Sequence, residues 1–146
     1  MTEIYSDEYF MNEALKEAEK AFDSEEVPVG CVVVWNNKII GRGHNLTETL
    51  NDATAHAEMQ ALTAASRFAG KYLKECTLYV TVEPCMMCAG ACFWTQIGAV
   101  VYGASDEKRG YTVVNGNILH PKTIVKSGIL KDKASELMIS FFKQKR

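Results

Sequence analysis

The pattern of apolar and polar positions along the chain predicts that helices alternate with strands. From residue 7 to 22 apolar side chains recur every three or four positions, as in an amphipathic helix, and Ser6 can cap the first turn. Two apolar runs rich in valine and isoleucine, 27–35 and 38–43, flank an asparagine pair at 36–37. Because asparagine tolerates the positive φ of a tight turn, these runs predict a β-hairpin that follows the first helix.

The rest of the chain continues this alternation. Residues 55–68 are rich in alanine and leucine and predict a second helix. The apolar run 76–82 predicts a strand, and Pro84 favours the first position of a helix that runs over 85–94. The remaining expected elements are a strand at 99–104, a connection at 105–121, a short strand at 123–127 and a helix at 131–143. Alternation of this kind predicts an α/β sandwich with an antiparallel hairpin first and crossover helices later.

The length and composition indicate one globular domain over residues 1–146. The chain is 47% hydrophobic and 23% charged, which is ordinary for a soluble protein of this size. We expect a cytoplasmic protein with no membrane partner, because the acidic N-terminus has no apolar signal segment and no run approaches the ~18 apolar residues of a membrane helix. The five cysteines are an odd number in a chain too large to depend on disulfides, so we interpret them as free thiols.

The net charge of −2 hides an asymmetry between the two ends of the chain. Residues 1–104 hold 7 basic and 14 acidic side chains, net −7, whereas residues 105–146 hold 9 and 4, net +5. The basic end could contact phosphates, but a solvated basic helix face explains the charge equally well. Because the whole chain is acidic, any contact with nucleic acid is expected to be local.

Three residues have the chemistry and spacing of a catalytic zinc site. Zinc in such sites takes three thiolate or imidazole ligands and leaves the fourth position to water. His56 opens the second predicted helix, and Cys85 and Cys88 form a Cys-x-x-Cys pair where the third begins. The positive end of a helix lowers thiol pKa values toward the thiolate that a metal needs. The sequence therefore predicts one zinc ion per chain.

A Cys-x-x-Cys pair has two alternative interpretations, a redox pair and half of a structural Cys₄ site. The Cys₄ site needs a second such pair, which the other cysteines do not supply. The redox interpretation leaves His56 and Glu58 without a role.

Glu58 is the candidate catalytic residue. Residues two apart point about 200° away from each other around a helix, so Glu58 is poorly placed to bind the ion that His56 holds. It can instead take a proton from a water molecule beside the ion and pass it to the substrate. His-x-Glu followed by Pro-Cys-x-x-Cys is a signature of zinc nucleobase deaminases, and "HAE" with "PCMMC" matches it.

On these motifs the chain resembles the bacterial tRNA-specific adenosine deaminases of the cytidine deaminase superfamily, which convert the wobble adenosine of a tRNA anticodon to inosine. The resemblance covers nearly the whole length and rests on "EVPVGCVVV", "GHN", "ATAHAEMQAL", "LYVTVEPCMMCAGA", "IGAVVYGASDEKRG" and "FFKQKR". It implies a three-layer α/β/α cytidine deaminase-like sandwich, with a mixed sheet of about five strands and helices on both faces. It also implies a homodimer.

The resemblance also implies roles for individual residues. It makes His56, Cys85 and Cys88 the zinc ligands and Glu58 the proton shuttle. The implied substrate-binding residues are Asn45, Val29 and Ala57. The candidates for contact with the tRNA anticodon loop are Phe142, Lys143, Lys145 and Arg146.

Some positions depart from the family pattern and keep other functions open. Leu46 stands where family members often have arginine, and "FWTQIGAVV" is neutral where they carry basic residues. Phe93 and Trp94 are similar to an aromatic pair of guanine deaminases, although core or dimer-interface positions also explain them. The alternatives are therefore a deaminase of a free base or nucleoside such as guanine or cytosine, and a non-catalytic zinc-stabilised RNA-binding module. The latter has no use for Glu58.

Overall fold

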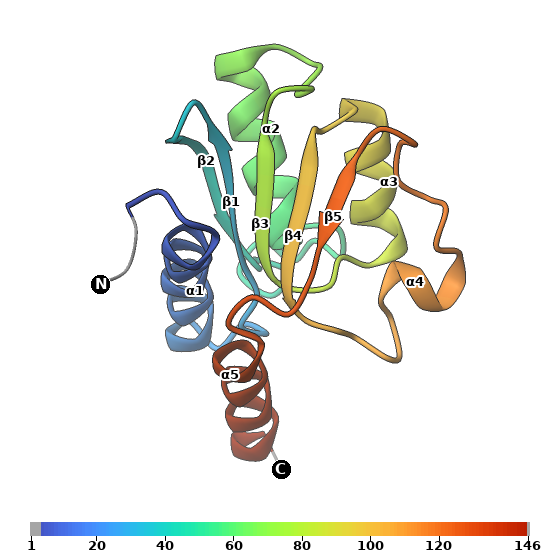
Figure 1. Cartoon of the computed structure of the whole chain (residues 1–146). Coiled ribbons are helices and arrows are strands. Elements are labelled where there is room, and N and C mark those ends of the chain that lie inside the picture. The colour runs from blue at the N-terminus through green and yellow to red at the C-terminus, as the bar shows by residue number, and fades with distance from the viewer. Residues whose placement is uncertain (1–3, 146) are drawn as a thin grey trace.

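The computed structural model describes residues 4–145, which form a five-stranded mixed sheet between helices (Figure 1). The strand order is β2-β1-β3-β4-β5. The strands are β1 (Gly30–Trp35), β2 (Lys38–His44), β3 (Thr77–Val82), β4 (Ala99–Ala104) and β5 (Ile124–Lys126). β1 pairs antiparallel with β2 and β3, whereas β3, β4 and β5 are parallel. The predicted mixed sheet of about five strands is confirmed.

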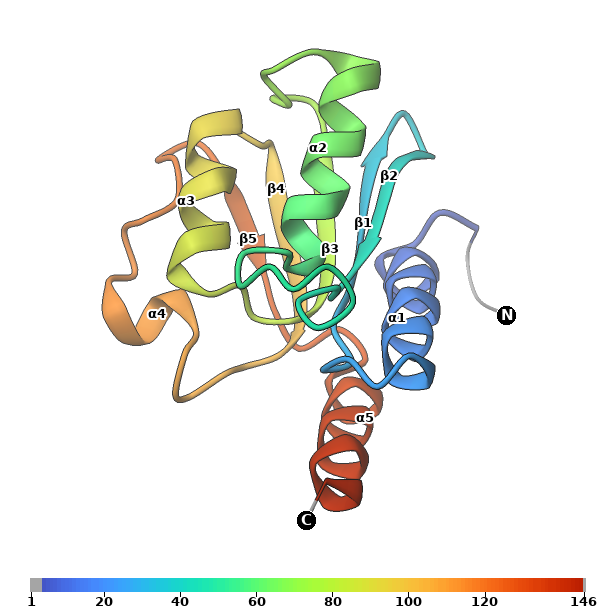
Figure 2. The ribbon, with the colours of Figure 1, turned by 180° about the vertical axis from the view of Figure 1, so that it is seen from behind.

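Helices cover both faces of this sheet. They are α1 (Asp7–Asp23), α2 (Ala57–Ala69), α3 (Met86–Thr95), α4 (Tyr111–Val114) and α5 (Lys131–Gln144). α1 and α5 lie on one face, and Figure 2 shows α2 and α3 side by side on the other. This arrangement confirms the predicted sandwich. Within residues 4–145, no helix has the length and apolar character needed to cross a bilayer.

Local sequence signals explain the first three elements. The Ser6 side chain accepts a hydrogen bond from the Tyr9 amide at 3.1 Å and so caps α1. Asn36 and Asn37 both have positive φ, 51° and 62°, as the tight turn between β1 and β2 requires. The helix and the hairpin are thus where the sequence predicts them.

Three predicted details of the helices are wrong. α2 begins at Ala57 and α3 at Met86, so His56 and Cys85 are the N-cap residues that precede the helices, and Pro84 lies outside α3. The connection at 105–121 contains the helix α4, which was not predicted. α4 has four residues, which is too few to show a helical repeat of apolar positions in the sequence. Its Tyr111 ring is buried in the core and anchors it.

The central strands are apolar on both sides because both of their faces are covered. Cys31 and Val33 of β1 pack in the core beneath α2 and α3. Val32 and Val34 pack with Phe10 of α1 in a second core on the opposite face.

Two glycines of β2 let α2 approach the sheet closely. A Cβ on Gly41 would lie 2.3 Å from the Ala61 carbonyl oxygen, and one on Gly43 would lie 2.4 Å from that of Ala57. α2 therefore rests on the backbone of β2, which fixes where this helix begins.

We expect Gly41→Ala to lower the free energy of unfolding by about 1–3 kcal/mol, because helix or strand must shift to admit the methyl group. Chemical denaturation measures this change. Gly116→Ala is the control, since a Cβ there meets nothing within 4 Å, and it should change stability by less than about 0.5 kcal/mol. Equal stability of the two variants would contradict the close packing of α2 on β2.

Candidate metal centre and active site

His56, Cys85 and Cys88 bring three metal-binding atoms together. Their ligand atoms all lie within 4.8 Å of one another, and each sulfur is 3.6 Å from Nδ1 of His56. Nitrogen and sulfur ligands at their usual distances from a tetrahedral zinc ion are about 3.6 Å apart. The donor set therefore fits zinc in both chemistry and spacing.

The fold delivers these donors at the starts of two neighbouring helices. His56 is the N-cap of α2 and Cys85 the N-cap of α3, and neither side chain makes a capping hydrogen bond. α2 and α3 lie side by side on one face, so their first residues meet at one end of the sheet (Figure 2). Both side chains are therefore available to a metal.

Hydrogen bonds within the cluster hold one thiol as a thiolate. The Cys88 thiol, and then His56, lower the pKa of Cys85 to about 4 against the opposing effect of burial. The hydrogen bond to Cys85 and burial raise the pKa of Cys88. The hydrogen bond that His56 donates to the Cys85 thiolate also raises the pKa of His56. A cation binding here would displace the protons that Cys88 and His56 hold.

Glu58 lies beside the metal-binding cluster without belonging to it. Its side chain is 4% exposed, and burial raises its pKa to about 7. The charges of Cys85 and His56 act on this carboxylate in opposite directions, the first raising and the second lowering its pKa. A carboxyl group with this pKa can both accept and release a proton near neutral pH.

The candidate substrate-binding residues lie on segments next to the cluster. Asn45 directly follows β2, and its backbone N–H donates to the Val29 backbone carbonyl at 3.2 Å. The Asn45 side-chain oxygen accepts from the Thr47 amide at 3.3 Å. The Ala57 side chain is buried in the core, so any contact that Ala57 makes with a substrate would come from its backbone.

Sequence reasoning missed the buried carboxylate of Glu26. Glu26 is fully buried, and its Oε2 accepts from the amide and hydroxyl of Thr49, both at 2.7 Å. Its Oε1 accepts from the Glu48 amide at 3.1 Å. Glu26 thereby holds the loop that follows Asn45. The sequence does carry a signal for this role, because Glu26 directly precedes an apolar run. A carboxylate that is buried there requires hydrogen-bond partners.

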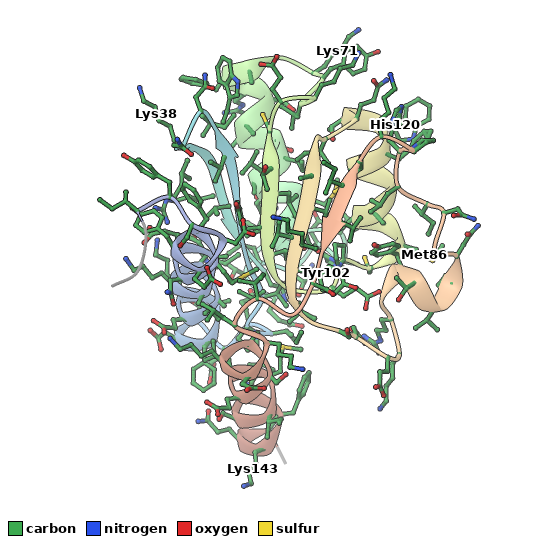
Figure 3. The ribbon with its side chains drawn as sticks, viewed as in Figure 1. Lys38, Lys71, Met86, Tyr102, His120 and Lys143 are labelled. Atoms are coloured by element: carbon green, nitrogen blue, oxygen red, sulfur yellow. The ribbon has the colours of Figure 1, made fainter. Side chains whose placement is uncertain are left out.

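Phe142 and Lys143 lie on α5, and Lys145 directly follows it. This helix projects past the end of the sheet at which α3 begins (Figure 1). Phe142 and Lys143 are exposed, and Figure 3 shows Lys143 at the far tip of this helix. The Lys145 ammonium lies 5.5 Å from the centre of the Phe141 ring. Arg146 lies outside the described residues.

The aromatic pair on α3 is on the surface. Trp94 is 77% exposed and Phe93 38% exposed, so the core interpretation of this pair is wrong. The dimer-interface interpretation stays a prediction.

Residues 4–104 match the family model described as the cytidine and deoxycytidylate deaminase zinc-binding region. The chain belongs to this family. It is 46% identical to a tRNA-specific adenosine deaminase of Aquifex aeolicus, over 95% of each chain. Among solved structures it is similar to one from a study of A-to-I editing by tRNA:A34 deaminases, with 38% identity and a TM-score of 0.81, covering 88% of this chain and 98% of that one. It is also similar to guanine deaminase from Bacillus subtilis, with 35% identity and a TM-score of 0.65 over 75% and 69% of the two chains.

We expect Cys85→Ala to lower zinc affinity by at least about a hundredfold, since losing a residue that merely supports a ligand already lowers metal affinity 10–100-fold. Metal analysis after dialysis against a weak chelator measures this loss. Cys92→Ala is the control, because Cys92 is a buried thiol of the same helix outside the donor set. Full zinc content in Cys85→Ala would remove Cys85 from the ligands.

Proposed function

We propose that the protein deaminates adenosine to inosine by zinc-dependent hydrolysis, at the wobble position of a tRNA anticodon. The buried carboxylate of Glu58 beside the His-Cys-Cys cluster carries the chemical part of this proposal, because a purely structural zinc site does not need it. The tRNA part rests on the similarity to tRNA-specific adenosine deaminases. A tRNA substrate also implies a cytoplasmic location.

The residues of the site can divide the reaction between them. A zinc ion bound by His56, Cys85 and Cys88 would lower the pKa of a water molecule and make it a nucleophile. Glu58 accepts the proton of that water as its oxygen forms a bond to C6 of the adenine. Glu58 then gives this proton to the ring nitrogen N1. It takes the second proton from the hydroxyl now on C6 and gives it to the departing amine, which leaves as ammonia when the C6–N bond breaks. The Asn45 amide can donate to and accept from the edge of the base and so hold it in place.

A base within an RNA loop must be turned out of its stack to reach such a site. Lys143 lies on α5, which projects past the same end of the sheet, and Lys145 directly follows this helix. Cations here can contact phosphates around the extruded base. The structure thus supports a polymer substrate through its shape as well as through charge.

A free base is the alternative substrate, and the similarity to guanine deaminase favours it. The two functions are separated by incubating the protein with a transcribed tRNA that carries adenosine at the wobble position, and in parallel with guanine, cytosine and adenosine. Inosine in the tRNA alone supports our proposal, whereas turnover of guanine alone refutes it. Binding of tRNA should also weaken steeply with added salt, unlike binding of a free base.

We further infer that two copies of the chain associate through α2 and α3. A largely apolar groove of about 500 Å³ runs between these helices. Its lining consists of Met59, Leu62, Ala91 and Trp94 together with the polar residues Thr63, Ser66, Arg67 and Thr95. Large exposed apolar patches on soluble proteins mark interaction surfaces. The family resemblance, which implies a homodimer, favours a second copy as the occupant.

We expect Trp94→Glu to convert a dimer into a monomer of 16.2 kDa, because it removes the largest apolar side chain of the groove and puts a charge in its place. Light scattering measures the mass in solution. The control is Ile139→Glu, which changes an exposed apolar residue of α5 on the opposite face of the sheet. A wild-type protein that is monomeric at micromolar concentration would contradict the inference.

We expect Glu58→Gln to lower the deamination rate by about a hundredfold or more, since the amide keeps the size of the side chain but cannot accept a proton. Zinc content and tRNA binding should remain at the wild-type level. Single-turnover kinetics with saturating enzyme isolates the chemical step. Near-normal turnover of this variant would mean that Glu58 does not shuttle protons.

A further inference from the structure

Glu83 is a second buried carboxylate that the reaction does not use. It directly follows β3, and its side chain is 5% exposed. Its Oε1 accepts from the Asp106 amide at 3.1 Å. Its Oε2 accepts from the Thr112 amide at 3.0 Å and from the Thr112 hydroxyl at 2.6 Å. All three donors belong to residues 106–112, which we call the 106–112 loop.

This loop is attached to the segment that carries the metal ligands. Gly110 and Cys85 form an antiparallel bridge, and the Tyr111 amide donates to the Pro84 carbonyl at 2.9 Å. A Cβ on Gly110 would lie 2.3 Å from the carboxylate of Glu83, so the loop is in close contact with this side chain. Figure 3 shows Met86, the first residue of α3, beside α4, which begins within the loop.

Further hydrogen bonds connect Asp106 to two exposed basic residues of the loop. The Asp106 carboxylate accepts from the amides of Lys108 and Arg109, at 3.1 and 3.0 Å. Glu83 binds the backbone of Asp106, and Asp106 in turn binds the backbone of the two basic residues. Lys108 and Arg109 are thereby held two residues and one residue, respectively, from Gly110, which forms the bridge to Cys85. Both side chains are exposed and carry the charge that attracts RNA phosphates.

We propose that Glu83 is a positioning residue that fixes the 106–112 loop as one wall of the entrance to the site and so sets the affinity for an RNA substrate. Burying a carboxylate is unfavourable unless hydrogen bonds compensate, and an apolar side chain could fill the same space without this requirement. The three directed hydrogen bonds specify where the loop lies, which apolar packing would not do. The link to RNA rests on the proposed function, whereas the link to the loop does not.

Glu83→Gln tests both links, because the amide nitrogen that replaces one oxygen cannot accept a hydrogen bond. In zinc-loaded protein we expect trypsin to cleave after Lys108 and Arg109 at least tenfold faster than in wild type. We expect the KM for the tRNA substrate to rise about tenfold while kcat changes less than twofold. A role in overall stability would instead lower kcat through loss of active enzyme and leave KM unchanged.

Matched variants separate these effects. Glu107→Gln removes an exposed carboxylate of the same loop, outside the hydrogen bonds described, and should leave cleavage and KM within twofold of wild type. Thr112→Val removes the hydroxyl donor and should shift both quantities in the direction of Glu83→Gln, whereas Thr112→Ser keeps the hydroxyl and should restore wild-type values. Thr112 is exposed, so these two variants test the proposal even if Glu83→Gln does not fold.

Wild-type cleavage and KM in both Glu83→Gln and Thr112→Val would overturn the proposal. Loss of zinc and of kcat at unchanged KM would also overturn it, since Glu83 would then support Cys85 and not the entrance. A wild-type protein inactive on tRNA would refute the proposed substrate and with it the RNA part of the proposal. Tryptic cleavage would still decide whether Glu83 holds the loop.

Discussion

The first residues of α2 and α3 must meet at one end of the sheet, and the rest of the site depends on this constraint. A side chain at an N-cap points out of its helix, so two parallel helices on one sheet face can bring His56 and Cys85 together. Cys88 adds the second thiol from the first turn of α3. The donors lie within 4.8 Å only while both helices keep their positions along the sheet. For α2 that position is set by its contact with the bare backbone of β2 at Gly41 and Gly43.

Much of the fold could be predicted because its signals are local or periodic. The helical spacing in residues 7–22, the Asn36-Asn37 turn and the apolar runs of β3 and β4 each specify an element without help from distant contacts. The helix boundaries at His56 and Cys85 could not be predicted, because composition continues smoothly through them. In the folded chain His56 and Cys85 have extended backbone dihedral angles, so each helix begins one residue after its metal ligand.

The metal cluster was predictable because its chemistry requires particular residue types at fixed spacing, whereas the surroundings of the site were not. Glu26 precedes the apolar run that leads into β1, and Glu83 follows β3. Both fall within segments that match the family, but their residue type and spacing do not reveal what they bind. Their partners are mainly backbone amides of loops 22 to 29 residues away along the chain. Only the folded chain reveals that a backbone amide, which every residue except proline carries, comes into reach of a particular carboxylate.

The distance along the chain between the metal ligands has a further consequence. His56 and Cys85 are 29 residues apart, so an ion that joins them closes a loop as a covalent cross-link would. By the chain-entropy relation for cross-links, closing a loop of this length removes roughly 3.5 kcal/mol of conformational entropy from the unfolded chain. This is a sizeable part of the free energy of unfolding of a typical protein, which is about 5–15 kcal/mol. Chelation should therefore loosen the attachment of α2 and α3 to each other as well as remove the chemistry, and folding and metal supply become linked for this chain.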